Sequence, residues 1–196
     1  MKHRSLSLIA LMALCLSATA QITAPTVQPR SETDTRYMAG AVLEHGGYAY
    51  LTRTIETDKS AEELMPVLDA WLQRCMNDSR IEYQRRLAPK ADNLLQHSVM
   101  IQLTFSQSFL SHDWADMSYV LTLEALPGKV VMNLERISYK YREGDDVVKY
   151  MAEEIITDSQ AITKKGKLVL GYKKFRIKTI DLMDEFETSL RSELQK

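Results

Sequence analysis

Cysteine is scarce in this sequence of 196 residues, which contains only Cys15 and Cys75. Cys15 lies in an apolar N-terminal segment that we predict to be removed, so the mature chain would form no internal disulfide. Leu14 fills the position where a lipoprotein signal has a small residue, which argues against a lipid anchor at Cys15. Cys75 follows the apolar spacing of a helix, which predicts a small buried side chain rather than a nucleophile, since a nucleophile needs a nearby base.

Long apolar runs are absent after the first 20 residues, so no later segment is predicted to cross a membrane as a helix. The N-terminus has the three parts of a secretory signal peptide. They are the basic residues Lys2, His3 and Arg4, the apolar run over residues 6–16, and the small-residue site Ala18-Thr19-Ala20. We therefore expect cleavage of residues 1–20 after Ala20 and a protein that is periplasmic or secreted.

Neither sign of charge dominates the chain. Cleavage would remove two of the 25 Lys and Arg residues and none of the 26 Asp and Glu residues, which leaves a net charge of −3. A chain without a basic excess has no global field that attracts nucleic acid, so we expect no nucleic-acid partner. Residues 21–36, rich in proline and hydroxyl residues, predict a flexible tether, and residues 37–196 have the length of a single domain.

Local motifs for metal binding are also absent. The histidines of the mature chain, His45, His97 and His112, lie at no ligand spacing from one another or from a cysteine. Two acidic groups have too few ligands for an EF-hand calcium loop, and we interpret them as solvated. They are Asp113 with Asp116, and the turn residues Glu143, Asp145 and Asp146 around Gly144. We therefore predict no metal and no cofactor.

Catalytic signatures are equally lacking, since no phosphate loop, nucleophile elbow or dinucleotide fingerprint occurs. Ser111, His112 and Asp113 have the residue types of a nucleophilic triad, but working triads assemble from separate parts of a fold. We interpret them as a polar loop between two strands, with Trp114 folding back on the core. The sequence thus predicts no catalytic residue, although a site built from distant residues stays open as an alternative.

Apolar periodicity is what the sequence does provide. Residues 41–43 and 48–55 around Gly46-Gly47 predict a β-hairpin, because paired glycines supply the positive φ of a tight turn. Apolar residues at 3-4 spacing predict a helix over residues 61–77, with a capping box from Ser60 and Glu63 and a kink if Pro66 lies inside it. Period-two patterns predict strands over residues 99–106, 119–125 and 130–141, and a weaker one over residues 81–87.

The C-terminal region is predicted to be helical, with a short helix over residues 147–156 and a long one over residues 172–194. We predict an α+β fold, an antiparallel sheet of about five or six strands with one helix from the N-terminal half and the long C-terminal helix packed on one face. The expected core includes Leu68, Trp71, Phe105, Leu121 and Phe186.

One predicted strand changes its phase. The apolar residues of 130–141 occupy even positions up to Leu134 and odd positions from Ile137 onward. A shift of one residue moves every later side chain to the opposite face of a sheet, so we predict a bulge near Glu135-Arg136 or an edge shared by two strands.

The helical stripe around Trp71, the serial strands and the C-terminal runs "AEEIITD", "KKGK", "GYKKFRIKTID" and "FETSL" resemble a family of exported Gram-negative bacterial proteins of unknown function. The resemblance covers residues 38–195 and is strongest in the last 45 residues. It implies a fold like half of the TATA-box-binding protein, with a strand, a helix, four strands and a helix in that order. It transfers no catalytic residue and does not imply DNA binding.

One basic cluster stands out near the C-terminus, where seven Lys and Arg residues fall within fifteen residues that contain no acid. Its helical part, Lys173, Lys174, Arg176 and Lys178, is the candidate face for an anion or an acidic partner. The alternative interpretation is the solvated side of a helix, balanced by the acids that follow it in the chain.

The function that these observations favour is an exported, non-catalytic binding module of the cell envelope, with an envelope protein, a glycan or a lipid as its partner. Its surface would be either an open sheet face or the basic helix region. Two alternatives stay open. One is a carrier of a lipid or other amphiphile in an apolar cavity between sheet and C-terminal helix, and the other is a hydrolase that uses His97 or His112 with distant acids.

Overall fold

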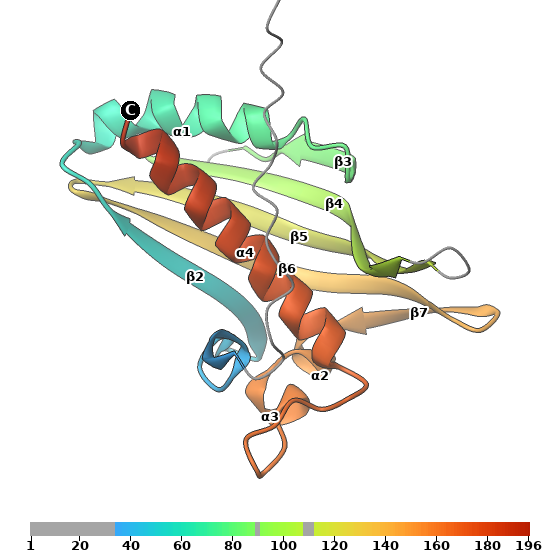
Figure 1. Ribbon diagram of the computed structural model, residues 1–196. Helices are drawn as coiled ribbons and strands as arrows, with labels where there is room; N and C mark the ends of the chain where they lie inside the picture. Colours follow the sequence, from blue (N-terminus) through green and yellow to red (C-terminus); the bar gives the residue numbers. More distant parts are fainter. Residues whose placement is uncertain (1–33, 89–90, 108–111) are drawn as a thin grey trace, which may run out of the picture. The chain divides into compact units, whose positions relative to one another are not determined.

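The computed structural model describes residues 34–88, 91–107 and 112–196, so the predicted signal peptide and residues 21–33 of the predicted tether lie outside this part of the chain. The elements are, in chain order, a 3-10 turn η1 (Thr35–Tyr37), β1 (Leu43–His45), β2 (Tyr48–Glu56), α1 (Ala61–Cys75), β3 (Ile81–Arg86), β4 (Leu94–Gln107), β5 (His112–Leu126), β6 (Lys129–Glu143), β7 (Asp146–Met151), α2 (Ala152–Ile155), α3 (Asp158–Ala161) and α4 (Lys173–Leu194). Figure 1 shows this arrangement, and the α+β class is confirmed.

The described sheet has seven strands, one more than the sequence patterns predict. The extra strand is β7, which occupies the first half of the helix predicted over residues 147–156. That prediction is wrong up to Met151, because each residue of β7 pairs with β6 across the turn at Gly144. Only Ala152–Ile155 is helical, and it forms a single turn.

The strands are antiparallel and follow the order β1-β2-β6-β5-β4-β3. Both β2 and β7 pair with the same edge of β6. The first half of β6 pairs with β2 at Glu56 to Leu51, and its second half pairs with β7 at Met151 to Asp146. The shared edge expected from the phase change is therefore present.

The predicted bulge lies at the junction of these two halves. Ser138 pairs with Ser118 and Glu135 pairs with Val120, so two residues of β6 oppose the single residue Tyr119 of β5. Arg136 at this point has a φ of 53°, the left-handed conformation that a bulged residue can adopt. The bulge keeps Leu134 and Ile137, which lie on either side of it, on the buried face.

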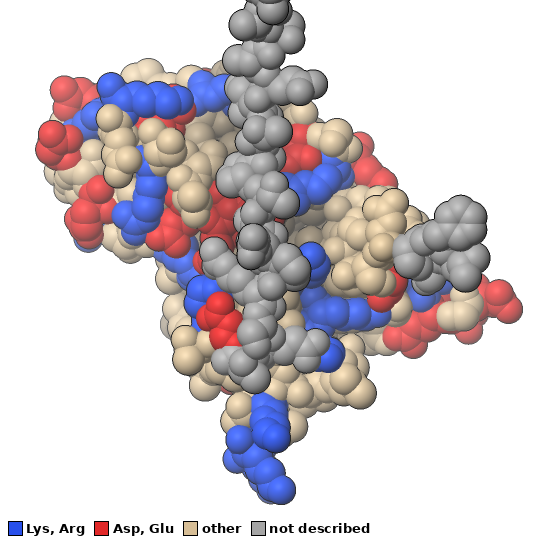
Figure 2. All heavy atoms as spheres, viewed as in Figure 1, with Lys and Arg blue, Asp and Glu red and all other residues tan. Residues whose placement is uncertain are grey.

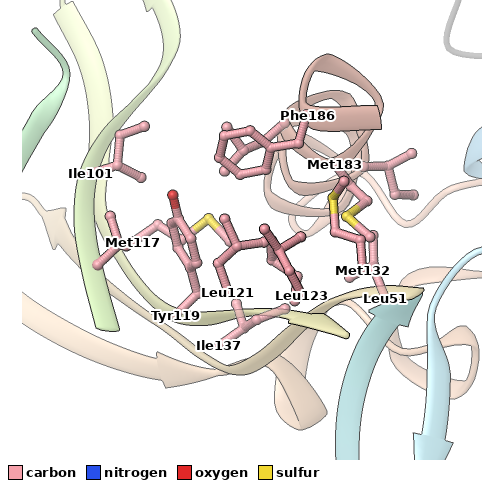
Figure 3. Packing of buried hydrophobic residues seen from close by; sticks show 14 of the residues in the cluster. Leu51, Ile101, Met117, Tyr119, Leu121, Leu123, Met132, Ile137, Met183 and Phe186 are labelled. Atoms are coloured by element: carbon pink, nitrogen blue, oxygen red, sulfur yellow. The ribbon is translucent and has the colours of Figure 1, made fainter. Parts of the chain in front are cut away.

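The long helices α1 and α4 both pack on one face of the sheet (Figure 1). This face is formed by alternate residues, which on β5 run from Ala115 through Met117 and Tyr119 to Ala125 and are almost completely buried. Met183 and Phe186 of α4 lie over Leu121, Leu123 and Met132 of the sheet (Figure 3). The core is therefore a single layer between sheet and helices.

Of the five predicted core anchors, Leu68, Trp71, Leu121 and Phe186 are buried, whereas Phe105 is half-buried near the end of β4. Trp71 packs edge-on against Phe186 with ring centroids 6.0 Å apart, and its Nε1 donates to Ser189 Oγ at 3.0 Å. The indole thus joins α1 to α4 by both apolar and polar contact.

The predicted capping box of α1 is present, with Ser60 N–H donating to the Glu63 carboxylate at 2.8 Å and Glu63 N–H donating to Ser60 Oγ at 3.3 Å. Pro66 lies inside α1, which begins at Ala61 and not at the proline. No helix of the described residues is long and apolar enough to cross a membrane.

Candidate binding site on the helix-free face of the sheet

The sheet face opposite α1 and α4 carries a cleft where β5, β6 and β7 run side by side. Side chains alternate between the two faces of a strand, so Trp114 and Asp116 point away from the helices while Ala115 points toward them. The register pairs Asp116 with Lys140, and Lys140 in turn with Lys149 of β7. Because this register is continuous, the face presents side chains of three strands in adjacent rows.

The cleft has a volume of about 580 Å³, within the range of small-molecule sites. Most of its lining residues are polar or charged. They are Ser106, His112, Asp113, Trp114, Asp116, Lys140, Tyr141, Arg142, Gly144 and Val147.

Trp114 forms the aromatic wall of the cleft. Its side chain is 36% exposed, unlike Trp71, which is 2% exposed in the core. The ring of His112 lies two residues away on the same face, with the centroids 6.3 Å apart and the planes tilted by 40°. An accessible indole face offers a large rigid surface for a ligand that has both apolar and polar groups.

Asp116 contributes an acceptor that the protein itself does not use. Its Oδ1 is inaccessible to solvent and accepts no hydrogen bond from any described residue. Burial raises the pKa of Asp116 above the ordinary value of 3.8, while the neighbouring Lys140 acts in the opposite direction. Such an orphaned acceptor is uncommon in folded proteins and is satisfied when a donor reaches it.

The cationic side chains near Trp114 and Asp116 are not neutralised by ion pairs within the described chain. Lys140, Arg142 and Lys149 are exposed, and none of them forms an ion pair with an acid of the described chain. The acids nearest in sequence, Glu143, Asp145 and Asp146, lie at the exposed turn between β6 and β7. The cleft lining thus carries two cations, Lys140 and Arg142, that form no ion pair in the described chain, together with the carboxylates of Asp113 and Asp116.

The predicted basic face on α4 is arranged differently. Arg176 is completely buried, and its Nε donates to the carbonyl of Tyr37 at 2.7 Å. Its other nitrogens donate to the carbonyls of Ile156 and Met38 and to Asp158 Oδ1, the last two at 2.7 Å. Arg176 therefore connects α4 to the N-terminal segment and to the α2–α3 region and is not accessible to an external anion.

Lys174 is also engaged within the domain. Its Nζ lies 3.0 Å from Asp113 Oδ2, donates to the Tyr141 hydroxyl at 2.6 Å and sits 3.9 Å from the centroid of that ring. Phe105 and Phe175 surround the ammonium group at 4.8 and 5.5 Å. Lys173 and Lys178 are half-buried, so the four predicted residues do not share one solvated face.

Figure 2 views the helix-covered face and shows acidic and basic side chains intermixed over α4. The acids follow the basic cluster along the helix and are paired there: Asp184 contacts both Arg36 and Arg53, and Glu187 binds Arg53 and Arg191 at 3.0 and 2.7 Å. Basic side chains gather instead on the exposed loop after α3, where Lys164, Lys165 and Lys167 lie.

The candidate triad is not assembled in the described residues. Ser111 lies outside them, and His112 and Asp113 point to opposite faces because they are consecutive in β5. Asp113 binds Lys174 on the helix side, whereas His112 lies beside Trp114. The same alternation separates Asp113 from Asp116, and no group of three potential metal ligands occurs in the described chain.

His97 is buried on the helix-covered face, where its Nδ1 has no hydrogen-bond partner among described residues. Burial, followed by the charge of Arg86, lowers its pKa below the ordinary 6.5 despite the nearby Asp69. His45 is exposed at the β1–β2 turn. Cys75 is half-buried against the core rather than fully buried, and burial raises the pKa of its thiol to about 12, which keeps the thiol protonated.

The sequence patterns do not predict the cleft, because they put Trp114 in a loop that folds back on the core. That interpretation is wrong, since β5 begins at His112 and carries Trp114 on the opposite face. A signal was available: Ala115 and Met117 continue the odd-numbered apolar series of residues 119–125 toward the N-terminus. Extending that alternation would have assigned Trp114 and Asp116 to the outer face.

Residues 52–140 match the family described as a domain of unknown function (DUF4468) with TBP-like fold. The match covers the central strands, not the last 45 residues in which the sequence resemblance was expected to be strongest. No curated protein is significantly similar to the chain.

Solved structures extend the likeness to the described domain. A DUF4468 family protein from Bacteroides ovatus ATCC 8483 is 29% identical, covers 83% of this chain and 95% of its own, and superposes with a TM-score of 0.76. A TBP-like protein from Parabacteroides distasonis ATCC 8503 is 17% identical, covers 79% of this chain and 97% of its own, and has a TM-score of 0.62, which shows a shared fold. Residues 52–140 of this chain therefore belong to the DUF4468 family, a family of unknown function with a TBP-like fold.

Proposed function

We propose that this protein is an exported, non-catalytic binding module of the cell envelope whose ligand occupies the cleft on the helix-free face. The observation that carries the proposal is the accessible indole of Trp114 beside the orphaned Oδ1 of Asp116. A desolvated acceptor without a donor costs free energy in the unliganded protein, and a ligand that donates to it recovers that cost.

The two alternatives find less support in the geometry. A carrier needs free volume between sheet and α4, where the buried side chains of Met132, Met183 and Phe186 lie (Figure 3). A hydrolase needs a base beside a nucleophile, but His112 and Asp113 point apart, and His97 has Arg86 and Asp69 as its charged neighbours. A binding role requires only the surface that the cleft provides.

Trp114 supplies the test of this proposal, because the other tryptophan, Trp71, is buried. Quenching of tryptophan emission by acrylamide reports chiefly on the accessible indole. We expect at least one of three probes, an oligogalacturonate, phosphatidylglycerol vesicles or a poly-glutamate peptide, to protect Trp114 saturably.

A matched pair of variants assigns the binding to the cleft. Trp114→Ala should abolish binding measured by calorimetry, and Tyr48→Ala, which removes an aromatic ring that is 68% exposed outside the cleft, should leave it unchanged. Protection by none of the probes, or undiminished binding by the Trp114→Ala variant, would contradict the proposal.

Export has its own test. N-terminal sequencing of protein from the envelope fraction should begin at Gln21, or within a few residues of it, because the three-part signal directs cleavage after Ala20. An uncut chain that remains in the cytoplasm would contradict the localisation while leaving the cleft hypothesis intact.

A further inference from the structure

We propose that the ligand of the cleft is an acidic saccharide, a sugar chain that carries carboxylate or sulfate groups; this inference rests on the proposed binding function. The sugar ring stacks on the indole of Trp114, a ring hydroxyl donates to Asp116 Oδ1, and the anionic substituent binds the cations of the neighbouring strands. Each of these three contacts corresponds to a feature of the described surface.

The indole of Trp114 favours a ligand ring that has an apolar face. Trp114 exposes 36% of its surface, and His112 extends the aromatic edge on the same strand face. The axial C–H groups of a pyranose give it an apolar face, while its hydroxyls stay at the periphery. A flat amphipathic wall with polar neighbours suits such a ligand.

The carboxylate of Asp116 favours a ligand that carries a hydrogen-bond donor. Asp116 lines the cleft and its Oδ1 has no hydrogen-bond partner among the described residues, so a neutral ring hydroxyl at this carboxylate adds a donor without adding like charge. A phosphodiester chain has no hydrogen-bond donor on its backbone phosphates and so offers none to this carboxylate. This arrangement favours a ligand with both hydroxyls and a separate anionic group over duplex DNA.

The cations of β6 and β7 favour a ligand that carries an anionic substituent. Lys140 is the cross-strand neighbour of Asp116, Lys149 is the neighbour of Lys140, and Arg142 belongs to the next row of the same face. None of these three cations is neutralised by an ion pair within the described residues. Arginine with a carboxylate or sulfate forms a bidentate pair, which adds geometric selectivity to the attraction.

A lipid surface is the less suitable occupant. Apart from the aromatic side chains, the lining of the cleft contains one large apolar residue, Val147, and the adjacent rows of the face contain Gln102, Ser118 and Ser138. No apolar groove for an acyl chain follows from these positions. The chemistry therefore combines an aromatic wall with hydrogen bonding and positive charge.

The test uses two probes that differ only in charge, an oligogalacturonate and its methyl-esterified form. We expect the full-length protein to bind the acid at least about tenfold more tightly than the ester, and this preference to shrink as salt rises to physiological concentration. Binding is followed by calorimetry and by protection of Trp114 from acrylamide.

Variants separate the contributions. Trp114→Ala should abolish binding of both probes. The double variant Lys140→Gln/Arg142→Gln should lower the affinity for the acid by about tenfold or more and leave the affinity for the ester unchanged. The control Lys173→Gln/Lys178→Gln removes two positive charges on α4 and should change neither affinity. Circular dichroism and the melting temperature should be unaffected, since Lys140 and Arg142 are exposed.

The outcomes distinguish this inference from the proposed function. Equal binding of acid and ester, or binding of phosphatidylglycerol vesicles or duplex DNA in preference to both, would overturn the acidic saccharide while a loss in Trp114→Ala still supported binding at the cleft. Binding that survives in Trp114→Ala would overturn both. If the α4 control variant lost binding of the oligogalacturonate, the binding site would lie on the basic helix, and the inference would be overturned.

Discussion

The two groups of basic residues in this domain have the same chemistry and opposite environments. At the start of α4, Arg176 and Lys174 are used internally, one by backbone carbonyls and Asp158, the other by Asp113 and three aromatic rings. On the helix-free face, Lys140 and Arg142 form no ion pair within the described chain. Lys174 and Arg176 of the dense cluster are therefore structural, whereas the sparse group, spread over two strands, is available to a ligand.

This comparison teaches that clustering along the chain does not measure accessibility. Arg176 and Lys174 precede the acids Asp181 and Asp184 on α4. Because one side of α4 packs on the sheet, part of this run of charged residues faces the interior of the domain. Lys140 and Lys149 are separated in sequence but become neighbours through strand pairing.

The largest effect is expected for Arg176→Met, which removes the donors of three carbonyl groups and leaves Asp158 without its buried partner. We expect the free energy of unfolding, measured by urea denaturation, to fall by about 3–5 kcal/mol. The control Lys178→Met should change it by less than about 0.5 kcal/mol. A loss below about 1 kcal/mol in Arg176→Met would show that the buried guanidinium is not a structural connection.

The two tryptophans provide the next contrast. Trp71→Ala removes a buried indole that contacts Phe186 and Ser189, and should lower the free energy of unfolding by about 3–5 kcal/mol. Trp114→Ala should lower it by less than about 1 kcal/mol, since Trp114 lies on the exposed face. Comparable losses in the two variants would contradict the assignment of Trp114 to a ligand surface.

A smaller effect is expected at Lys174, which is 28% exposed in its side chain. Lys174→Met keeps an unbranched side chain but removes the cation from the rings of Phe105 and Phe175 and from Asp113. We expect a loss of about 1–2 kcal/mol in urea denaturation. The double variant Lys174→Met/Asp113→Asn should restore part of it, because no unpaired carboxylate is left; a further loss would mean that the ion pair is not what stabilises this corner.

The smallest effect is expected at Asp116 and has the opposite sign. Because its pKa is raised in the folded protein, the folded state favours the protonated acid, and stability is lost as pH rises through that pKa. Asp116→Asn should therefore be more stable than the parent at neutral pH by less than about 1 kcal/mol. The difference should vanish below pH 3.8, the ordinary value. A less stable variant at neutral pH would show that the carboxylate already has a partner.

Sequence patterns predicted most of the architecture, and the phase change in β6 shows why. The move of apolar residues from even to odd positions after Leu134 required a bulge, because a strand cannot otherwise keep Ile137 on the buried face. The long helices were predicted for the same reason, since their apolar stripes are local features of the chain. The capping box of Ser60 and Glu63 is likewise local and was predicted correctly.

Predictions failed where local patterns were weak and partners distant. In β7 Val147 and Lys149 are exposed, so the segment has little apolar alternation and is a strand through its pairing with β6. The burial of Arg176 also could not be predicted, because two of its carbonyl partners, Tyr37 and Met38, lie 139 and 138 residues before it in the sequence.

The sequence by itself determined the α+β class, the strands with clear alternation, the two long helices and the bulge, because these depend on residue spacing within one segment. Only the tertiary structure decided which cations are buried and which remain accessible. That choice depends on strand register and helix docking, which bring Trp114, Asp116 and Lys140 to one face and enclose Arg176 between segments more than a hundred residues apart. Long-range packing therefore set the location of the candidate site, and local composition did not.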